Sequence, residues 1–134
     1  MGKTKRWWRR SRNSIGLRFL IAPGFRNSHG HWWLAFQEAL PIAFAGVVPS
    51  THACNAGYFA RVGVLRKHCG RGLQLRLMRA MESRARNSGW NCVVSDTTDN
   101  SASANNFIRA GYRLYQPQHP WAWPNTLYWR KSVV

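Results

Sequence analysis

A glycine-bearing turn between an apolar strand and an amphipathic helix constrains this chain more than any other feature. Residues 64–74 (VLRKHCGRGLQ) end a strand, turn at Gly70 and Gly72, and lead into a helical pattern. The first amides of a helix lack an internal partner, and the helix dipole places partial positive charge on them. The two glycines have no side chain to keep a ligand from this backbone, so the turn can bind a pyrophosphate. Many loops that bind no ligand have the same glycine spacing, so the surrounding segments must show whether this turn is a binding site.

The segments around the turn predict a single α+β domain. Leu73, Leu77, Met81 and Ala85 recur every four residues and form one apolar helical stripe. Apolar runs bounded by Gly, Pro and Asn predict strands on both sides. We expect strands at residues 17–22, 31–37, 42–48, 58–65, 92–96, 112–115 and 127–131, and helices at 71–87 and 102–110. A length of 134 residues with 45% hydrophobic content suffices for one core.

Four segments in a fixed order carry a resemblance to a known family. They are VLR at 64–66, CGRGLQ at 69–74, VSD at 94–96 followed by Asn100, and the helix from Ser103 to Tyr112. In order and spacing they resemble the GNAT superfamily of acyl-CoA N-acetyltransferases, over residues 56–130. The resemblance implies a mixed, mostly antiparallel sheet flanked by helices. It also implies direct transfer of an acetyl group from acetyl-CoA to a primary amine in a ternary complex.

The resemblance also implies where the cosubstrate binds. The third strand would separate from its neighbour near residues 62–64, and the pantetheine arm would enter the gap. A backbone amide there would polarise the thioester carbonyl. The implied CoA-binding residues are Val62, Gly63, Val64, Cys69, Gly70, Arg71, Gly72, Leu73, Gln74, Asn100, Ser103, Asn106 and Phe107.

Three residues depart from the family pattern. Cys69 stands where Arg or Gln is usual, and Gln74 stands where Gly or Ala is usual. Because the turn works through backbone amides, we expect binding to survive, with the Gln74 side chain able to donate to a phosphate. Phe107 takes the place of the family's tyrosine acid and has no proton to give, so another group or water must protonate the leaving thiolate.

Candidate catalytic residues follow the second half of the pattern. Asp96, at the end of a central strand, is the candidate base, or else a turn-capping or arginine-paired carboxylate. Tyr115 and Tyr112 are the candidate acids, or else core aromatics. Asn100 and Asn106 are expected to bond CoA or cap the last helix rather than to take part in chemistry.

The excess of positive charge suggests a second kind of partner. The chain has 20 Lys and Arg against four acidic residues, for a net charge of +16. Residues 1–28 form a basic arm in which Trp7 and Trp8 are interleaved with Lys and Arg, ahead of a domain at 29–134. Such an arm is either a solvated tail or a nucleic-acid contact. The alternative functions are therefore nucleic-acid binding on a degenerate scaffold, or acetylation of an amine carried on RNA, such as an aminoacyl-tRNA.

The region before residue 31 is short for this family. A first strand fits, but the paired front helices that wall the acceptor side do not. The acceptor pocket is then open, differently shaped, or completed by a second chain, which leaves a homodimer open. Trp121 and Trp123, flanked by prolines, either pack or line the acceptor entrance.

Several classes are excluded by composition. The three cysteines cannot all pair and none lies in a CxxC motif, which favours a reducing cytoplasm. His52 with Cys54 and His68 with Cys69 lack zinc-finger spacing, so no metal is expected. No run reaches the ~18 apolar residues of a membrane span. Arg18 interrupts the apolar run near the N-terminus, so export is not expected either.

Overall fold

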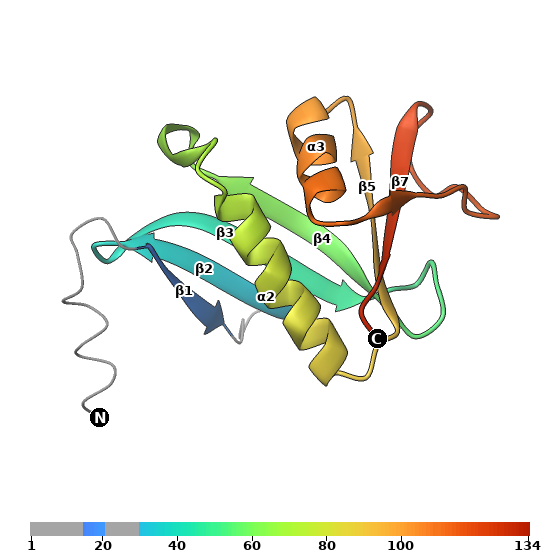
Figure 1. The fold of residues 1–134 in the computed structure, drawn as a ribbon, viewed down its shortest axis with the longest axis horizontal. Coiled ribbons are helices and arrows are strands. Elements are labelled where there is room, and N and C mark those ends of the chain that lie inside the picture. Colours follow the sequence, from blue (N-terminus) through green and yellow to red (C-terminus); the bar gives the residue numbers. More distant parts are fainter. Residues whose placement is uncertain (1–14, 21–29) are drawn as a thin grey trace.

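The computed structural model describes residues 15–20 and 30–134 (Figure 1). Its elements are β1 (Ile15–Leu20), β2 (His31–Gln37), β3 (Leu40–Pro49), β4 (Ala56–Val64), the 3-10 helix η1 (Arg66–His68), α2 (Leu73–Asn87), β5 (Cys92–Thr98), α3 (Ser101–Arg109), β6 (Arg113–Leu114) and β7 (Thr126–Ser132). The predicted basic arm at 1–28 lies outside the described residues apart from β1. No described helix is long and apolar enough to cross a membrane.

The strands form one mixed sheet of seven, in the order β1-β2-β3-β4-β5-β7-β6. Every neighbouring pair is antiparallel except β4 and β5, which are parallel. This pair is joined by the crossover through α2, because parallel strands cannot be joined by a hairpin. The predicted mixed, mostly antiparallel sheet is confirmed.

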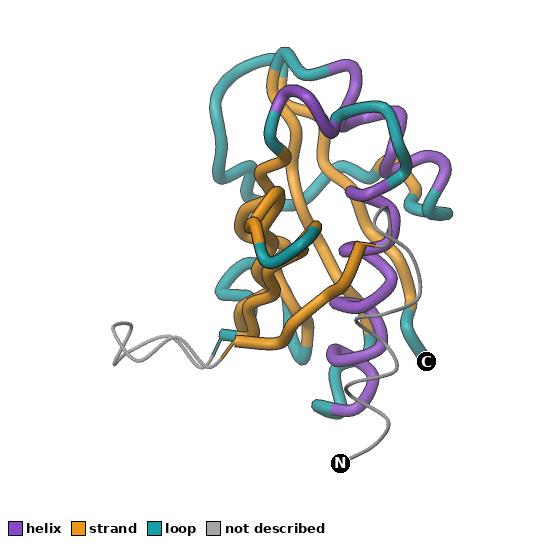
Figure 2. The backbone as a smooth tube through the Cα atoms, turned by 90° about the vertical axis from the view of Figure 1, so that its left-hand side faces the viewer, coloured by secondary structure: helices purple, strands orange, loops and turns teal. Residues whose placement is uncertain are grey.

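Helix α2 packs across one face of the sheet (Figure 1), and it runs alongside the strands in the side view of Figure 2. Its stripe residues Leu73, Leu77, Met81 and Ala85 are buried with Phe107 of α3 in the main core. A smaller cluster of Ala56, Cys92 and Val94 lies on the other face and includes no helix residue. The two faces of the sheet therefore offer different surroundings.

Some strands begin at other residues than the sequence predicted. Glu38 and Ala39 have positive φ of 49° and 66°, as a two-residue hairpin turn requires, so β3 begins at Leu40 and not at residue 42. Strand β1 is described at Ile15–Leu20 and pairs with Trp32–Gln37, so it begins two residues before the predicted start at Leu17. Only residues 21–30 separate β1 from β2, fewer than one helix of average length, about 11 residues. Residues 21–29 lie outside the described residues, so the expected reduction of the front helices stays a prediction.

The central pair of strands forks. Strands β4 and β5 pair only from Ala56 to Tyr58 with Cys92 to Val94. Beyond Tyr58, β4 remains paired with β3 and β5 remains paired with β7. In β4 the register steps from Phe59 to Arg61, so Ala60 forms a bulge at the start of the fork. The strands are therefore separate from Phe59 onward, three residues before Val62 and earlier than the expected position.

Candidate active site

The turn before α2 has the backbone geometry of an anion site. Gly70 and Gly72 have φ of 78° and 74°, and a Cβ at either position would meet nothing within 4 Å. The glycines are thus needed for conformation and for open space, not for a tight contact.

The amides of this turn are available to a ligand. Cys69 N donates to Arg66 O at 3.3 Å, and Arg76 N donates to Gly72 O at 3.1 Å. Gly72 is the N-cap of α2 and makes no side-chain capping bond. Within residues 30–134 and 15–20, the amides of residues 70–75 have no acceptor. They are the free donors that a pyrophosphate requires.

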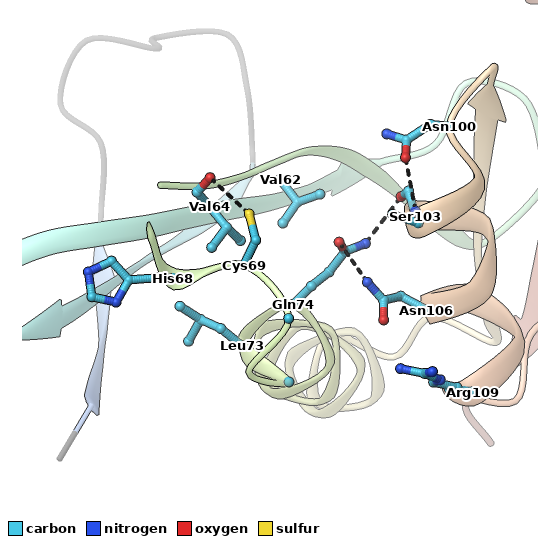
Figure 3. Close-up of a pocket in the computed structure, with 13 residues that line it drawn as sticks. Val62, Val64, His68, Cys69, Leu73, Gln74, Asn100, Ser103, Asn106 and Arg109 are labelled. Carbon is cyan, nitrogen blue, oxygen red and sulfur yellow. Dashed lines mark hydrogen bonds between the residues drawn. The ribbon is translucent and has the colours of Figure 1, made fainter. Parts of the chain in front are cut away.

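A cavity of about 320 Å³ opens beside these amides (Figure 3). It lies between β4, the turn and α3. Its lining residues are Val62, Val64, His68, Cys69, Gly70, Gly72, Leu73, Gln74, Asn100, Ala102, Ser103, Asn106 and Arg109. Ten of the predicted CoA-binding residues are among them, while His68, Ala102 and Arg109 were not anticipated. His68 lies between two of the compared segments, and Arg109 lies within the last of them, where the resemblance assigned it no role.

Three predicted CoA-binding residues do not line this cavity. Gly63 lies under the Phe44 ring, where a Cβ would come within 2.3 Å of Cε1. Phe107 is 2% exposed and stacks on Trp129 with ring centroids 5.6 Å apart. Arg71 is exposed on the turn itself. A role for these three in binding CoA stays a prediction.

The Gln74 side chain joins the two helices. Its Nε2 donates to Ser103 Oγ at 3.2 Å, and its Oε1 accepts from Asn106 Nδ2 at 3.0 Å (Figure 3). Asn100 Oδ1 accepts from Ser103 N at 3.0 Å and so caps α3. Gln74 therefore supports the wall of the cavity through both polar side-chain atoms, and donation to a phosphate stays a prediction.

Asp96 lies on the opposite face of the sheet, next to the start of the fork. Its Oδ2 accepts from Tyr58 Oη at 2.5 Å and from Trp121 Nε1 at 2.8 Å. The His52 ring stacks on Trp121 with centroids 4.2 Å apart and planes 7° apart. Asp96 is half-buried. It is thus neither a turn cap nor an arginine-paired carboxylate.

Tyr58 is the site residue that the sequence reasoning missed. It is the last residue of β4 that pairs with β5, opposite Val94. Its burial, then its hydrogen bond to Asp96 and the charge of that carboxylate, hold the pKa of Tyr58 well above its usual range. A tyrosine in a strand reads as a packing residue, and the sequence contains no signal for its long-range bond to Asp96.

The structure separates the two candidate acids. Tyr112 is 4% exposed in the main core, beside Phe107, and does not line the cavity. Burial, with the nearby Glu82, raises the pKa of Tyr112. Tyr115 is half-buried and packs in the smaller cluster with Tyr58, on the face of Asp96. Burial raises the pKa of Tyr115 as well.

Comparison with known proteins identifies the family. The model of the acetyltransferase (GNAT) family matches residues 4–112, so the chain belongs to the GNAT acetyltransferases. Acyl-CoA-dependent acetyl transfer is the general activity of this class. No curated protein sequence matches the chain significantly. Among the described residues no group of three or more His, Cys, Asp or Glu could hold a metal ion.

Solved structures share the fold at low identity. A protein assigned to the GNAT acetyltransferases from Desulfovibrio desulfuricans has a TM-score of 0.76 and 12% identity, over 90% of this chain and 100% of that one. An IAA acetyltransferase from Bacillus cereus has a TM-score of 0.69 and 12% identity, over 89% and 99%. PaiA N-acetyltransferase from Thermoplasma acidophilum, in complex with coenzyme A, has a TM-score of 0.65 and 13% identity, over 75% and 59%.

Proposed function

We propose that this protein transfers an acetyl group from acetyl-CoA to a primary amine by direct attack in a ternary complex. The observation that carries the proposal is the set of uncommitted amides at residues 70–75, which open onto the cavity beside the β4–β5 fork. A pyrophosphate on these amides would direct the rest of the cosubstrate toward the fork. A reducing cytoplasm stays our expectation, because three cysteines cannot all pair.

The fork would receive the pantetheine arm. Past Tyr58, one edge of β4 stays paired with β3, and its other edge faces β5 without pairing with it. Backbone N–H groups along this edge are suited to hydrogen-bond the arm and to polarise the thioester carbonyl. The thioester would then lie near the start of the fork, next to Tyr58 and Val94.

Asp96 is the proposed base. Both of its hydrogen bonds are made by Oδ2, which leaves Oδ1 for the acceptor amine. The amine nitrogen attacks the thioester carbon while Asp96 takes a proton, the new C–N bond forms and the C–S bond breaks. The CoA thiolate takes a proton from Tyr58, which regains one from the protonated Asp96. Once Asp96 is neutral, two of the causes that raise the Tyr58 pKa are removed, so Tyr58 becomes a better acid.

Tyr115 is the alternative proton donor, since it lies on the same face as Asp96. Tyr112 is disfavoured in this role by its burial in the main core. Comparing the thiol-release rates of Tyr58→Phe and Tyr115→Phe distinguishes Tyr58 from Tyr115 as the proton donor.

Calorimetric titration with acetyl-CoA tests the proposal. Gly72→Glu places a carboxylate in the anion site and should abolish binding. Gly89→Glu is the matched control, since Gly89 has a similar φ of 80° and equally open space at the other end of α2. Equal binding by both variants, or no binding by the wild type, would refute the proposed site.

Nucleic-acid binding is the second candidate, and one observation favours it. The exposed residues of α2 are four arginines, a serine and an asparagine: Arg76, Arg79, Ser83, Arg84, Arg86 and Asn87. Arginine suits phosphate recognition, and this face has no exposed apolar residue for a membrane. RNA affinity that falls steeply with salt, in a protein that does not bind acetyl-CoA, would support this function over the transferase. Acetylation of an amine carried on RNA would require both RNA binding and acetyl-CoA binding.

A further inference from the structure

Two arginines face each other on the last two strands of the sheet. Arg113 of β6 is the direct cross-strand partner of Arg130 of β7. Both side chains are exposed. Directly opposed residues on neighbouring strands project from the same face, and like charges in that arrangement destabilise the pair. The pair therefore concentrates positive charge at one place on the sheet.

This place lies on the face of the candidate base. In β7, Tyr128 pairs with Asp96 and Arg130 pairs with Val94, so all four residues project from one face. Trp129, between them, projects into the main core on the other face. By strand geometry, the Cα atoms of Asp96 and Arg130 are roughly 8 Å apart.

Electrostatics agrees with this placement. The charges of Arg130 and Asp96 both act on the Tyr115 hydroxyl, so the three groups are close in space. After the bulge, Arg61 projects to the same face, and its positive charge acts to lower the pKa of Tyr58. The only ion pair in the described part of the chain is Lys131 with Glu82, on the α2 side of the sheet. The arginine pair thus has no carboxylate partner among the described residues.

We propose that the acceptor carries an anionic group, a carboxylate or a phosphate, in addition to its amine. Arg113 and Arg130 bind the anion, while the amine faces Asp96. A guanidinium pair matches the paired oxygens of either anion, and the anion would relieve the repulsion between the two arginines. The same positive charge disfavours polyamines, which would bring further cations to this face. This inference rests on the proposed transferase function.

Thiol release with matched acceptors tests the inference. The acceptors are ω-amino acids from glycine to 6-aminohexanoate with their amides, phosphoethanolamine with ethanolamine, and spermidine. We expect the anionic member of a pair to have a kcat/KM at least about tenfold higher, through KM, as a charge-assisted hydrogen bond would provide. The chain-length series reports the spacing between anion and amine, and the phosphate pair distinguishes the two anions.

Variants connect the preference to the arginine pair. Arg113→Gln with Arg130→Gln should remove the preference and leave the amides unchanged. Arg79→Gln, on the outer face of α2, removes one charge elsewhere and should keep the preference. A preference that survives the double substitution, or faster turnover of amides or spermidine, would overturn the inference.

A binding measurement distinguishes failure of the anion-site inference from failure of the proposed transferase function. Protein saturated with CoA has no acetyl group to transfer, so acceptor binding can be titrated without turnover. Tighter binding of the anionic amines, lost in the double variant, supports the anion site even if no acceptor is acetylated. Equal binding of amino acids and amides overturns the inference whether or not the enzyme turns over.

Discussion

Asp96 has surroundings that a sequence motif could not reveal. One of its oxygens holds Tyr58 and Trp121, and a stacked His52 covers the Trp121 ring. Each of these partners comes from a different segment of the chain. The carboxylate is therefore fixed by tertiary contacts, while its other oxygen is left for a substrate.

Asp96→Asn should lower kcat by about 10²- to 10⁴-fold, the range typical for loss of a general base. Asparagine keeps the shape and can still accept from Tyr58 and Trp121, so acetyl-CoA affinity should not change. Stopped-flow thiol release and calorimetry measure the two quantities. A variant that keeps full kcat would remove Asp96 from the mechanism.

His31 should make the protein less stable in mild acid. Burial, then the charge of Arg84, lowers the pKa of His31 from its usual 6.5. Between the folded and unfolded pKa values the unfolded state binds more protons, so stability is full above pH 6.5 and falls as the pH decreases below it. Urea unfolding at several pH values should show this loss in the wild type and a smaller one in His31→Asn. Identical pH profiles would contradict it.

At the scale of elements, the cavity depends on the side-chain hydrogen bonds that link α2 to α3. Gln74 of α2 reaches Ser103 and Asn106 of α3, and Asn100 caps the same helix. The fork contributes the other wall, because β4 and β5 each keep a different partner after Tyr58. The site is thus an arrangement of whole elements around the turn.

Gln74→Ala should destabilise the protein by about 1–2 kcal/mol, as expected for loss of two partly buried hydrogen bonds. It should also weaken acetyl-CoA binding, since the cavity wall is no longer held. Ser101→Ala, at an exposed position of α3, is the control and should change neither quantity. Urea unfolding and titration measure both effects, and an unchanged Gln74→Ala variant would show that the bridge is dispensable.

At the scale of the whole molecule, charge is divided between two regions. Residues 1–29 hold eight of the 20 basic residues, and all four acids come later. The described part has its own basic surfaces on α2 and on the sheet face that carries Arg113 and Arg130. Nucleic-acid contact by the N-terminal arm and a second copy of the chain remain predictions.

Removal of residues 1–12 should weaken polyanion binding and leave acetyl-CoA affinity nearly unchanged. That segment holds six Lys and Arg, which would release counterions on binding to a single-stranded RNA. The slope of log K against log salt should fall in magnitude by up to about 4. Fluorescence anisotropy at several salt concentrations and calorimetry are the measurements. An equal loss of both affinities would show that the arm and the CoA site are one unit.

Local patterns were enough to predict most of the fold. Strand β2 was predicted at its observed bounds, and α2 ends at Asn87 as expected. Ten of the predicted CoA-binding residues line the cavity, because the turn and its glycines are set by nearby backbone. Phe107 and Gly63 were assigned from a motif and do not line the cavity, because Phe107 packs in the core and Gly63 lies under the Phe44 ring.

The sequence by itself determined the order of the elements, the glycine-bearing turn before α2 and the family, because periodicity and glycine conformation are short-range properties. Only the tertiary structure decided which face each catalytic candidate occupies. The bulge at Ala60 shifts strand parity, and the pairing of β5 with β7 brings Asp96, Val94 and Arg130 to the face opposite α2. Such placement depends on contacts between strands that are distant in the sequence, and the β5–β7 pairs of Asp96 and Val94 join residues more than 30 positions apart, which no local pattern contains.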